Sequence, residues 1–311
     1  MIVDASFLRY LPSDMPLQLY VREPAPGNKL TPWTALIGTI QSSPIELSLM
    51  STATLLFTSG TTGPSKACEL SHSYFNSVAR SLINSLQLTS NDVLFCPFPL
   101  CHADATSLTV IPALLLCTTA AISERFSARR WWDEIRQTRS TVADFMGATL
   151  SILFKAPPTA RDADNTLRIM WGVPVPAWVE QFEERFALNV YEVYGSTETG
   201  LPVVQDINRL RVKGSCGVAL EGASLKIVNE AGEEVDRGTV GELLVLQAAG
   251  KRFTGSYRKV KTRLCSSKGI TYSGTRLLQR HRVHIEERPR WVVSYRRSLS
   301  PGFRRKSVLY R

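Results

Sequence analysis

From Thr54 to Tyr194, short apolar runs alternate with stretches that have helical periodicity. Leu55–Phe57 is an apolar run of the kind found in buried strands, and the following His72–Leu86 repeats its apolar residues every four positions. Strands separated by helices join into a parallel sheet through crossover connections. This alternation therefore predicts an α/β fold for the body of the chain.

The alternation continues in the second half of this region. Thr166–Trp171 and Asn189–Tyr194 are predicted strands. Between them Trp178, Phe182 and Phe186 recur every four residues, so they mark the buried face of a helix rather than a cofactor site. The three segments together predict a βαβ unit.

Two further elements are predicted on either side of that unit. Ser127 is the expected N-cap of a helix that carries Trp131 and Ile135. After the α/β body, Ser224–Val228 and Gly241–Leu246 flank a turn-like sequence and are expected to pair as a small antiparallel β unit.

The overall composition is that of a globular protein, with 44% hydrophobic and 21% charged residues. The apolar run Leu108–Cys117 is much shorter than the roughly 20 residues that span a bilayer, so no membrane span is expected. The N-terminus lacks the pattern of a secretory signal. The six cysteines include no repeated CxxC pair, which argues against a zinc cluster and against a disulfide framework. These features predict a cytoplasmic protein with reduced thiols.

Positive charge is concentrated in residues 251–311, which hold 18 of the 37 Lys and Arg but only two of the 27 Asp and Glu. A nucleic-acid-binding arm has this composition, and aromatic residues for base stacking are interleaved with the charges at Tyr257, Tyr272, Trp291 and Tyr295. The alternative is that a shifted reading frame or a wrong exon replaced the original sequence. We favour the alternative, and do not expect nucleic acid as a partner.

A loop rich in glycine and hydroxyl groups directly follows the first predicted strand. Its sequence is Thr58-Ser59-Gly60-Thr61-Thr62-Gly63-Pro64-Ser65-Lys66. The glycines let backbone N–H groups approach a ligand and the lysine supplies an ammonium group, which together suit a polyphosphate. The P-loop of NTPases is a poorer match, because Pro64 and Ser65 separate Gly63 from Lys66.

A second polar motif, Tyr194-Gly195-Ser196-Thr197-Glu198, lies at the end of the last strand of the predicted βαβ unit. The ends of strands are where α/β sheets place their ligand-binding residues. A tyrosine can stack on a purine, a threonine hydroxyl can reach a phosphate oxygen, and a glutamate can bind magnesium.

In this order, the two motifs resemble those of the adenylate-forming superfamily, which includes the AMP-dependent synthetases and ligases and the acyl-CoA synthetases. Pro97–His102 resembles the family segment that ends in an acyl-pocket histidine, and Gly172-Val173-Pro174 stands where the family has its adenine-binding turn. The resemblance extends from about Thr54 to Leu246. Residues 126–158 look most similar to carnitine- or crotonobetaine-CoA ligases.

The resemblance implies an acid-thiol ligase. Such an enzyme forms an acyl-adenylate from ATP, with Mg²⁺, and a small-molecule carboxylate, and then transfers the acyl group to coenzyme A. It also implies an α/β fold that is a partial N-terminal domain of the adenylate-forming fold, with mixed sheets flanked by helices and a small β subdomain, and with the C-terminal domain missing.

The same resemblance assigns the site residues. The α-phosphate of ATP is assigned to Thr197, the magnesium ion to Glu198 and the acyl pocket to His102. The loop residues assigned to the phosphates are Thr58, Ser59, Gly60, Thr61, Thr62, Gly63 and Lys66. The remaining nucleotide contacts are assigned to Gly172, Val173, Pro174, Tyr194, Gly195 and Ser196. The residues expected to take part in catalysis are Lys66, His102, Thr197 and Glu198.

The chain departs from the family pattern at both ends. Members begin well upstream of the phosphate loop and end with a mobile domain that carries a catalytic lysine, and Thr275 stands where the family has a ribose-binding aspartate. We therefore expect impaired catalysis, with a catalytically inactive nucleotide-binding homologue as the alternative. The predicted organisation is a partial connecting segment (1–50), an AMP-binding α/β core (51–204), a small β subdomain (205–250) and a basic tail that is disordered or frame-disrupted (251–311).

Overall fold

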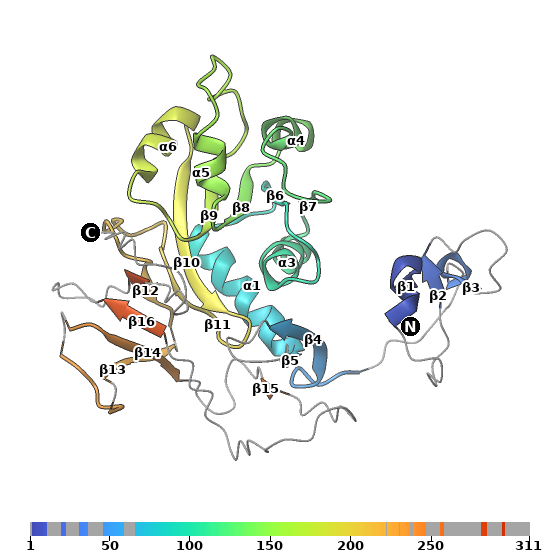
Figure 1. Cartoon of the computed structure of the whole chain (residues 1–311), viewed down its shortest axis with the longest axis horizontal. Coiled ribbons are helices and arrows are strands. Elements are labelled where there is room, and N and C mark those ends of the chain that lie inside the picture. Colours follow the sequence, from blue (N-terminus) through green and yellow to red (C-terminus); the bar gives the residue numbers. More distant parts are fainter. Residues whose placement is uncertain are drawn as a thin grey trace. The chain divides into compact units, whose positions relative to one another are not determined.

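The structure is a computed structural model, and Figure 1 shows it as a cartoon. It describes residues 2–10, 20–22, 31–36, 46–58, 66–221, 223–229, 231–236, 239–246, 256–257, 281–284 and 294–295. The chain divides into two compact units, Met1–Leu47 and Ser48–Arg311. The domain boundaries expected from the sequence stay predictions.

The first unit contains a small sheet of three parallel strands and two 3₁₀ helices. Val21 is its fully buried residue among those described. The elements are β1 (Ile2–Asp4), η1 (Ala5–Tyr10), β2 (Tyr20–Arg22), β3 (Thr31–Pro32) and η2 (Trp33–Leu36).

The second unit is built around a seven-stranded sheet with the order β12-β11-β10-β9-β8-β6-β7. From β7 to β10 all neighbouring strands are parallel, and β11 and β12 add an antiparallel edge. The strands are β6 (Val93–Cys96), β7 (Thr119–Ile122), β8 (Val142–Met146), β9 (Ile169–Val173), β10 (Asn189–Ser196), β11 (Gly200–Val204) and β12 (Val218–Ala219).

Helices cover both faces of this sheet, as crossover connections require (Figure 1). Buried side chains of α1 and η3 form one apolar cluster with one face of the sheet, and those of α4, α5 and α6 form a second cluster with the other face. The helical elements are α1 (His72–Leu86), α2 (Ala103–Ala105), η3 (a π-helix, Thr106–Val110), α3 (Ile111–Leu116), α4 (Trp131–Thr138), α5 (Thr149–Phe154) and α6 (Val179–Phe186).

Two smaller sheets complete the second unit. The antiparallel pair β4 (Thr52–Thr58) and β5 (Lys66–Ser71) is extended by β15 (Ser256–Tyr257). The other sheet has the order β13-β14-β16-β17. Its strands are β13 (Ser224–Val228), β14 (Gly241–Leu246), β16 (His281–His284) and β17 (Ser294–Tyr295).

Three of these short strands, β15, β16 and β17, belong to the basic segment 251–311. They pair with β5, with β14 and with each other. The other residues of this segment, Thr275 among them, lie outside the described residues. The nature of the segment therefore stays a prediction.

The predicted secondary structure is confirmed for most elements. The helix His72–Leu86 and the strands Ser224–Val228 and Gly241–Leu246 have the bounds expected from the sequence. The βαβ unit is also confirmed, because β9 and β10 are parallel neighbours with α6 between them along the chain. Together the sheets and helices form the predicted mixed α/β fold.

The predicted N-cap at Ser127 is wrong. The helix begins at Trp131, its N-cap is Arg130, and no side chain caps it. Ser127 lies one turn earlier and contributes its backbone carbonyl, which accepts the N–H groups of Arg130 (3.1 Å) and Trp131 (2.9 Å). A backbone turn thus satisfies the donors that a serine hydroxyl was expected to satisfy. Trp131 and Ile135 are buried, as predicted.

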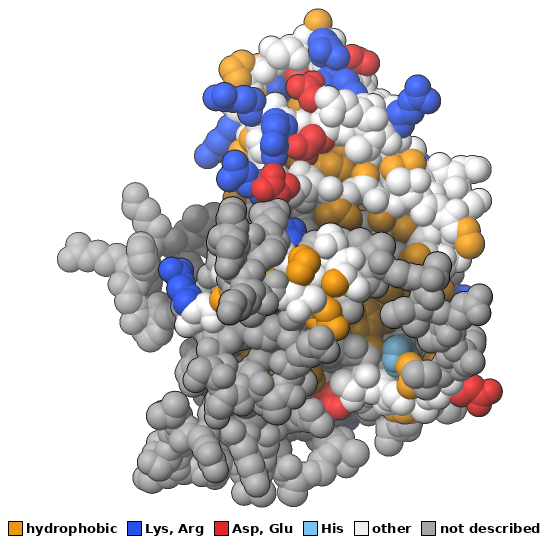
Figure 2. Space-filling view, turned by 90° about the vertical axis from the view of Figure 1, so that its right-hand side faces the viewer, with side chains coloured by type: hydrophobic (Ala, Val, Ile, Leu, Met, Phe, Trp, Pro, Cys, Tyr) orange, Lys and Arg blue, Asp and Glu red, His pale blue; other side chains and the backbone are white. Residues whose placement is uncertain are grey.

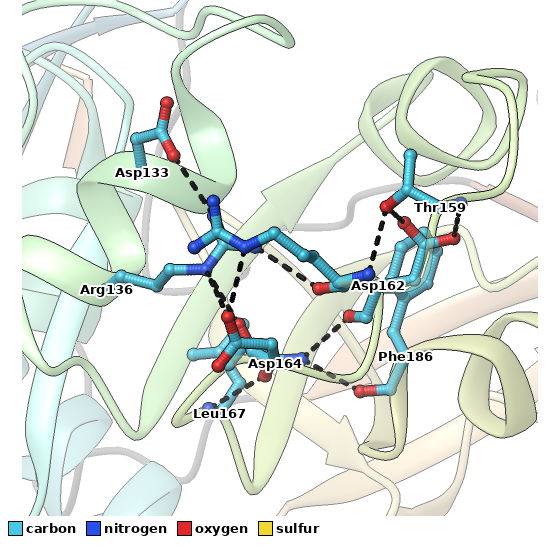
Figure 3. A network of polar contacts seen from close by, with 9 residues as sticks. Asp133, Arg136, Thr159, Asp162, Asp164, Leu167 and Phe186 are labelled. Atoms are coloured by element: carbon cyan, nitrogen blue, oxygen red, sulfur yellow. Dashed lines mark hydrogen bonds and ion pairs between the residues drawn. The ribbon is translucent and has the colours of Figure 1, made fainter.

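A polar network holds the long connection between α5 and β9 against two helices (Figure 3). Arg136 of α4 donates to the carbonyl of Asp164 (2.7 Å) and to the carboxylate of Asp133 (3.0 Å). The Asn165 amide donates to the carbonyl of Phe186, at the end of α6 (2.9 Å). Side-chain hydrogen bonds to backbone carbonyls therefore fix the connection to α4 and to the end of α6.

Charged and hydrophobic side chains are unevenly distributed on the face that Figure 2 shows. In the view of Figure 2, charged side chains gather at the top, the end where Figure 1 draws α4 and α6, and hydrophobic side chains are exposed below them. Leu55 and Phe57 of β4, Leu114 of α3 and Ile122 of β7 are among the exposed apolar residues. Within the described part of the chain, no helix combines the length and hydropathy needed to cross a membrane.

The carboxylate of Asp92 joins the starts of the parallel strands. Asp92 lies directly before β6 and is 3% exposed. Its carboxylate accepts a hydrogen bond from Thr141 (2.8 Å), the residue before β8. It also accepts from two nitrogens of Arg168 (both 2.8 Å), the residue before β9. Its backbone carbonyl accepts from Thr118, which precedes β7. Burial alone would raise the pKa of Asp92, but the bonds from Arg168, the Thr89 N–H and Thr141 outweigh it and lower the pKa.

We predict that Asp92→Asn lowers the free energy of unfolding by about 2 kcal/mol at pH 7. Hydrogen bonds to a charged group contribute roughly 1.5–3 kcal/mol, and the partly exposed Arg168 moderates the loss. The pKa of Asp92 is lower in the folded state than in the unfolded state. Its carboxylate therefore stabilises the fold fully above the pKa of the unfolded state, and this stabilisation is lost as pH falls through the pKa of the folded state. Urea unfolding at pH 7 and pH 3 measures both effects.

The matched control is Asp133→Asn, at an exposed ion pair with Arg136, where a change of about 0.5 kcal/mol or less is expected. An equal loss of stability in Asp92→Asn and Asp133→Asn would contradict the assigned role of Asp92.

Candidate functional site

The sheet has a topological switch point between β6 and β8. After β6 the chain adds β7 on one side, and it then returns to add β8, β9 and β10 on the other side. Because these strands are parallel, their carboxyl ends share one edge of the sheet. Ligands of open α/β sheets bind in the crevice at such an edge, next to the switch point.

Three of the predicted motifs lie at this edge. Pro97–His102 follows β6, Gly172–Pro174 forms the end of β9 and the residue after it, and Tyr194–Glu198 forms the end of β10 and the turn into β11. These segments are up to about 100 residues apart along the chain, and the parallel register brings them to the same end of the sheet.

The predicted phosphate loop closes the antiparallel β4–β5 hairpin. Thr58 and Lys66 are direct partners across the two strands, at the tip of the hairpin. The loop residues between them lie outside the described residues, as does the side chain of Lys66. They are Ser59, Gly60, Thr61, Thr62, Gly63, Pro64 and Ser65.

Electrostatic interactions connect this hairpin to the Tyr194–Glu198 motif. Cys68, which follows Lys66 by two positions on β5, has a pKa raised to about 12 by burial and by the negative charges of Glu198 and Glu69. The pKa of Tyr74, in the first turn of α1, is also raised, first by burial and then by Cys68, Glu198 and Asp104. The charge of Glu198 therefore acts on side chains of both β5 and α1.

The turn after β10 requires a glycine at position 195. A Cβ atom there would lie 1.9 Å from the carbonyl oxygen of Gly200, where a bulge interrupts the β10–β11 register. The hydroxyl of Ser196 accepts the N–H of Thr199 (3.2 Å) and so closes the turn. Thr197 is half-buried within this turn and Glu198 is 4% exposed.

Tyr194 is 4% exposed and belongs to an apolar cluster between the large sheet and the β13–β14 sheet. The other buried members of this cluster are Val203, Cys216, Ile227, Leu243 and Val245. The ring thus contributes to the core at this edge, and its predicted contact with adenine stays a prediction.

The predicted adenine turn, Gly172-Val173-Pro174, is packed tightly against β8. A Cβ atom on Gly172 would lie 1.8 Å from the carbonyl oxygen of Phe145, so a larger residue does not fit. The carbonyl of Val173 accepts the N–H of Gly147, the residue after β8 (2.8 Å). This hydrogen bond therefore fixes the turn to the end of β8, the neighbouring strand on the side of the switch point.

His102 forms an ion pair with Asp104 beside the switch point. Its Nδ1 lies 2.9 Å from the Asp104 carboxylate. That hydrogen bond raises the pKa of His102, while partial burial opposes the change. The His102 side chain is about half exposed. Its predicted place at the acyl pocket stays a prediction.

Two buried acids at this edge were not singled out from the sequence. Asp144 of β8 is 1% exposed, and the thiol of Cys96 lies 3.5 Å from its carboxylate. Its pKa is raised well above the usual range, first by burial and then by the charge of Asp104. Glu192 of β10 is 8% exposed, and burial raises its pKa to about 8. A lone acid inside an apolar strand is the sequence signal that identifies both.

The assigned magnesium ligand is a single carboxylate. Among the residues that the structure describes, no three or more His, Cys, Asp or Glu side chains group so as to hold a metal ion. Glu198 offers the oxygen ligand that Mg²⁺ prefers, and one carboxylate together with ATP phosphates is a usual set for this ion. The residues present therefore fit magnesium that arrives with the nucleotide.

We predict that Asp144→Asn becomes increasingly more stable than the wild type as pH rises from 4.5 to 8. Burial raises the pKa of Asp144 in the folded state above its pKa in the unfolded state. The folded wild type is therefore most stable below the pKa of the unfolded state, and it loses stability as pH rises towards the pKa of the folded state. Asparagine resembles the protonated acid and has no proton to lose. Urea unfolding at both pH values tests this, with Asp133→Asn as the exposed control. A pH-independent difference would contradict the prediction.

Comparison with known proteins places these motifs in context. A sequence profile of the family described as AMP-binding enzyme matches residues 10–250. The medium/long-chain-fatty-acid–CoA ligase FadD17 of Mycobacterium marinum is 31% identical over 222 residues, which are 71% of this chain and 43% of that protein. The crotonobetaine/carnitine–CoA ligase of Salmonella typhi is 28% identical over 217 residues, 68% of this chain and 41% of that protein. The chain thus spans about two fifths of the length of these relatives.

Solved structures show the same fold. ATP-bound MatB from Rhodopseudomonas palustris is 25% identical and superimposes with a TM-score of 0.67 over 80% of this chain and 49% of its own. The acyl-CoA synthetase of Brucella canis has a TM-score of 0.77 over 94% of this chain and 55% of its own, at 21% identity. At 21% identity, the similarity to the Brucella canis protein shows a shared fold alone.

Proposed function

We propose, from the premise that this chain belongs to the family of AMP-binding enzymes, that it joins a carboxylic acid to coenzyme A through an acyl-adenylate. The resemblance to the adenylate-forming superfamily predicted from the sequence is confirmed by the family profile and by the related CoA ligases. The use of ATP and coenzyme A is part of the proposal, and the family resemblance supports it. The acid, the role of Mg²⁺ and a cytoplasmic location are part of the proposal.

One observation supports the proposal: after burial, the negative charge of Glu198 raises the pKa of Cys68, which lies two positions after Lys66 on the hairpin whose tip is the Thr58–Lys66 loop. A carboxylate and a polyphosphate-binding loop are the two groups that hold a magnesium–nucleotide complex. We therefore assign the magnesium–nucleotide complex to the carboxyl edge of the parallel sheet, beside the switch point.

The chemistry takes place in two steps. A carboxylate oxygen of the acid attacks the α-phosphorus of ATP, and the bond to the bridging oxygen breaks so that pyrophosphate leaves. The sulfur of coenzyme A then attacks the acyl carbon, and AMP leaves with the electron pair of the broken bond. Neither step uses a protein nucleophile, so the protein acts by positioning and by charge neutralisation.

The proposed roles of the residues follow the order of the motifs. The Thr58–Lys66 loop binds the β- and γ-phosphates, Thr197 the α-phosphate, and Gly172–Pro174 with Tyr194 the adenine. Glu198 holds Mg²⁺, which when bound neutralises charge on the phosphates. His102 borders the acyl group, next to Asp104.

We predict that Lys66→Ala weakens the binding of ATP by roughly 10- to 150-fold in the presence of magnesium. The change removes an ammonium group whose charge-assisted contact with phosphate is worth roughly 1.5–3 kcal/mol. Isothermal titration calorimetry measures the affinity. The matched control is Lys226→Ala, on β13, where the lysine pairs with Glu234 and no change in affinity is expected. Equal ATP affinity in wild type and Lys66→Ala would contradict the assignment of the loop.

We also predict pyrophosphate release that requires ATP, magnesium and a carboxylic acid together. The assay uses a panel of carnitine-like and medium-chain acids, each with coenzyme A. Release above the acid-free control supports the proposed reaction. If ATP binds but no acid in the panel produces pyrophosphate, the chain is a nucleotide-binding homologue without the ligase reaction.

A further inference from the structure

His102 and Asp104 form a pair that the proposed chemistry leaves without a role for the acid. His102 ends the segment that follows β6, and Asp104 lies in α2, two residues further along the chain. The Nδ1 atom of His102 lies 2.9 Å from a carboxylate oxygen of Asp104. The Asp104 side chain is 19% exposed, whereas the His102 side chain is 52% exposed. The pair therefore combines a sheltered carboxylate with an imidazole that a ligand can reach.

The backbone of His102 is held on both sides. Its N–H donates to the carbonyl of Pro99 (2.9 Å). Its carbonyl accepts from the backbone N–H of Thr106 (3.3 Å) and from the Thr106 hydroxyl (3.1 Å). The imidazole is thus attached to a fixed stretch of backbone, and its remaining freedom is in side-chain torsions that the contact with Asp104 restricts.

Two groups of Asp104 compete for the Nδ1 atom of His102. The carboxylate oxygen lies at 2.9 Å, whereas the backbone N–H of Asp104, which would donate to Nδ1 as a helix cap, lies at 3.4 Å, beyond the usual length of such a bond. An unprotonated Nδ1 would direct its lone pair at the lone pairs of the carboxylate. We therefore assign a proton to Nδ1, which donates it to Asp104.

This assignment leaves the other ring nitrogen for a ligand. Among the described residues, the hydrogen bond and the ion pair of the His102 ring both involve Nδ1, and none reaches Nε2. In the imidazolium form Nε2 also has a proton, so it can donate to an anionic oxygen.

The surroundings of the pair favour the imidazolium form. The hydrogen bond to Asp104 raises the pKa of His102, partial burial opposes the rise, and the charge of Asp104 adds to it. Asp104 also raises the pKa of Asp144 on β8 and of Tyr74 on α1, where burial is the larger cause. Of these three groups, His102 is the one whose charged form is positive, so its protonation neutralises the charge of Asp104.

We propose that Asp104 is a positioning residue for His102, which orients the imidazolium so that its Nε2–H donates to the carboxylate of the acid. This inference rests on the proposed function, because it takes the acyl pocket at His102 from that assignment. Asp104 itself does not contact the acid. One carboxylate oxygen of the acid attacks the α-phosphorus of ATP, and the other accepts from Nε2–H, which holds the attacking oxygen in line.

Asparagine is the substitution that separates charge from shape at position 104. It keeps the size of aspartate and an oxygen that can accept from Nδ1–H, but it has no charge. We expect the titration midpoint of His102 to fall in Asp104→Asn, because the raising charge is lost while partial burial still favours neutral imidazole. At pH 7 less imidazolium is then available to the acid, and a lower pH restores it.

The first measurement is an NMR titration of the four histidines in the full-length chain, with ¹³C-labelled imidazole rings. The His102 signal is identified by its absence in His102→Gln. We expect a lower midpoint in Asp104→Asn than in wild type, and no change in the control Asp133→Asn, an exposed acid paired with Arg136. An unchanged midpoint in Asp104→Asn overturns the inference. If Asp104→Asn does not fold, a wild-type midpoint no higher than that of an exposed histidine overturns it instead.

The second measurement is pyrophosphate release from the same proteins with ATP, magnesium, coenzyme A and the panel of acids. We expect Asp104→Asn to raise the KM for the acid about tenfold at pH 7, the effect of one hydrogen bond. This difference is expected to narrow at pH 5.5, because the lower pH restores the proton on His102. The affinity for ATP, measured by calorimetry, is expected to stay unchanged.

The outcomes separate this inference from the proposed function. If the KM for the acid is unchanged while the midpoint of His102 falls, Asp104 does not serve acid binding, although the proposed function stands. A KM that rises equally at both pH values, or a parallel loss of ATP affinity, indicates general damage to the fold and also overturns the inference. If wild type binds ATP but releases no pyrophosphate with any acid, the proposed function fails, and this inference with it.

Discussion

The carboxylate of Asp92 aligns the starts of the parallel strands, and the position of the site depends on that alignment. Residues that directly precede β7, β8 and β9 all donate to Asp92, which itself precedes β6. Strands that start level and run parallel end near one another, so the motifs that follow β6, β9 and β10 meet at the opposite edge. A polar group at one end of the strands thereby sets the level at which the candidate site forms at the other end.

Acids at the two ends of the sheet differ in how they are satisfied. Asp92 has a guanidinium partner and a lowered pKa, so its charge is stabilised where it lies. Asp144 and Glu192 have raised pKa values, with burial as the largest cause, and no cation among the described residues lowers either pKa. Burial of an unpaired charge is costly, and such groups remain neutral instead. The Asp144 carboxyl accepts a hydrogen bond from the Cys96 thiol (3.5 Å), while Glu198 is the acid that the proposed function assigns to a metal ion.

Much of the fold could be predicted from the sequence, because hydrophobic periodicity reports directly on burial. The helix His72–Leu86 and the strands Ser224–Val228 and Gly241–Leu246 were predicted to the residue. The cap at Ser127 was not, because whether a serine uses its hydroxyl or its carbonyl depends on the path of the preceding turn. Asp144 and Glu192 were overlooked, because a single polar residue in an apolar strand does not show in sequence what it faces.

The sequence by itself determined the α/β class, the order of the motifs and the family to which the chain belongs, since local periodicity and short motifs contain that information. Only the tertiary structure decided that the charge of Glu198 acts on Cys68 and Tyr74, that Tyr194 is part of an apolar cluster, and that Glu192 of β10 pairs with Gly172 of β9. These facts depend on strand order and register, which bring together residues far apart in the chain. Neither periodicity nor spacing specifies which strands become neighbours.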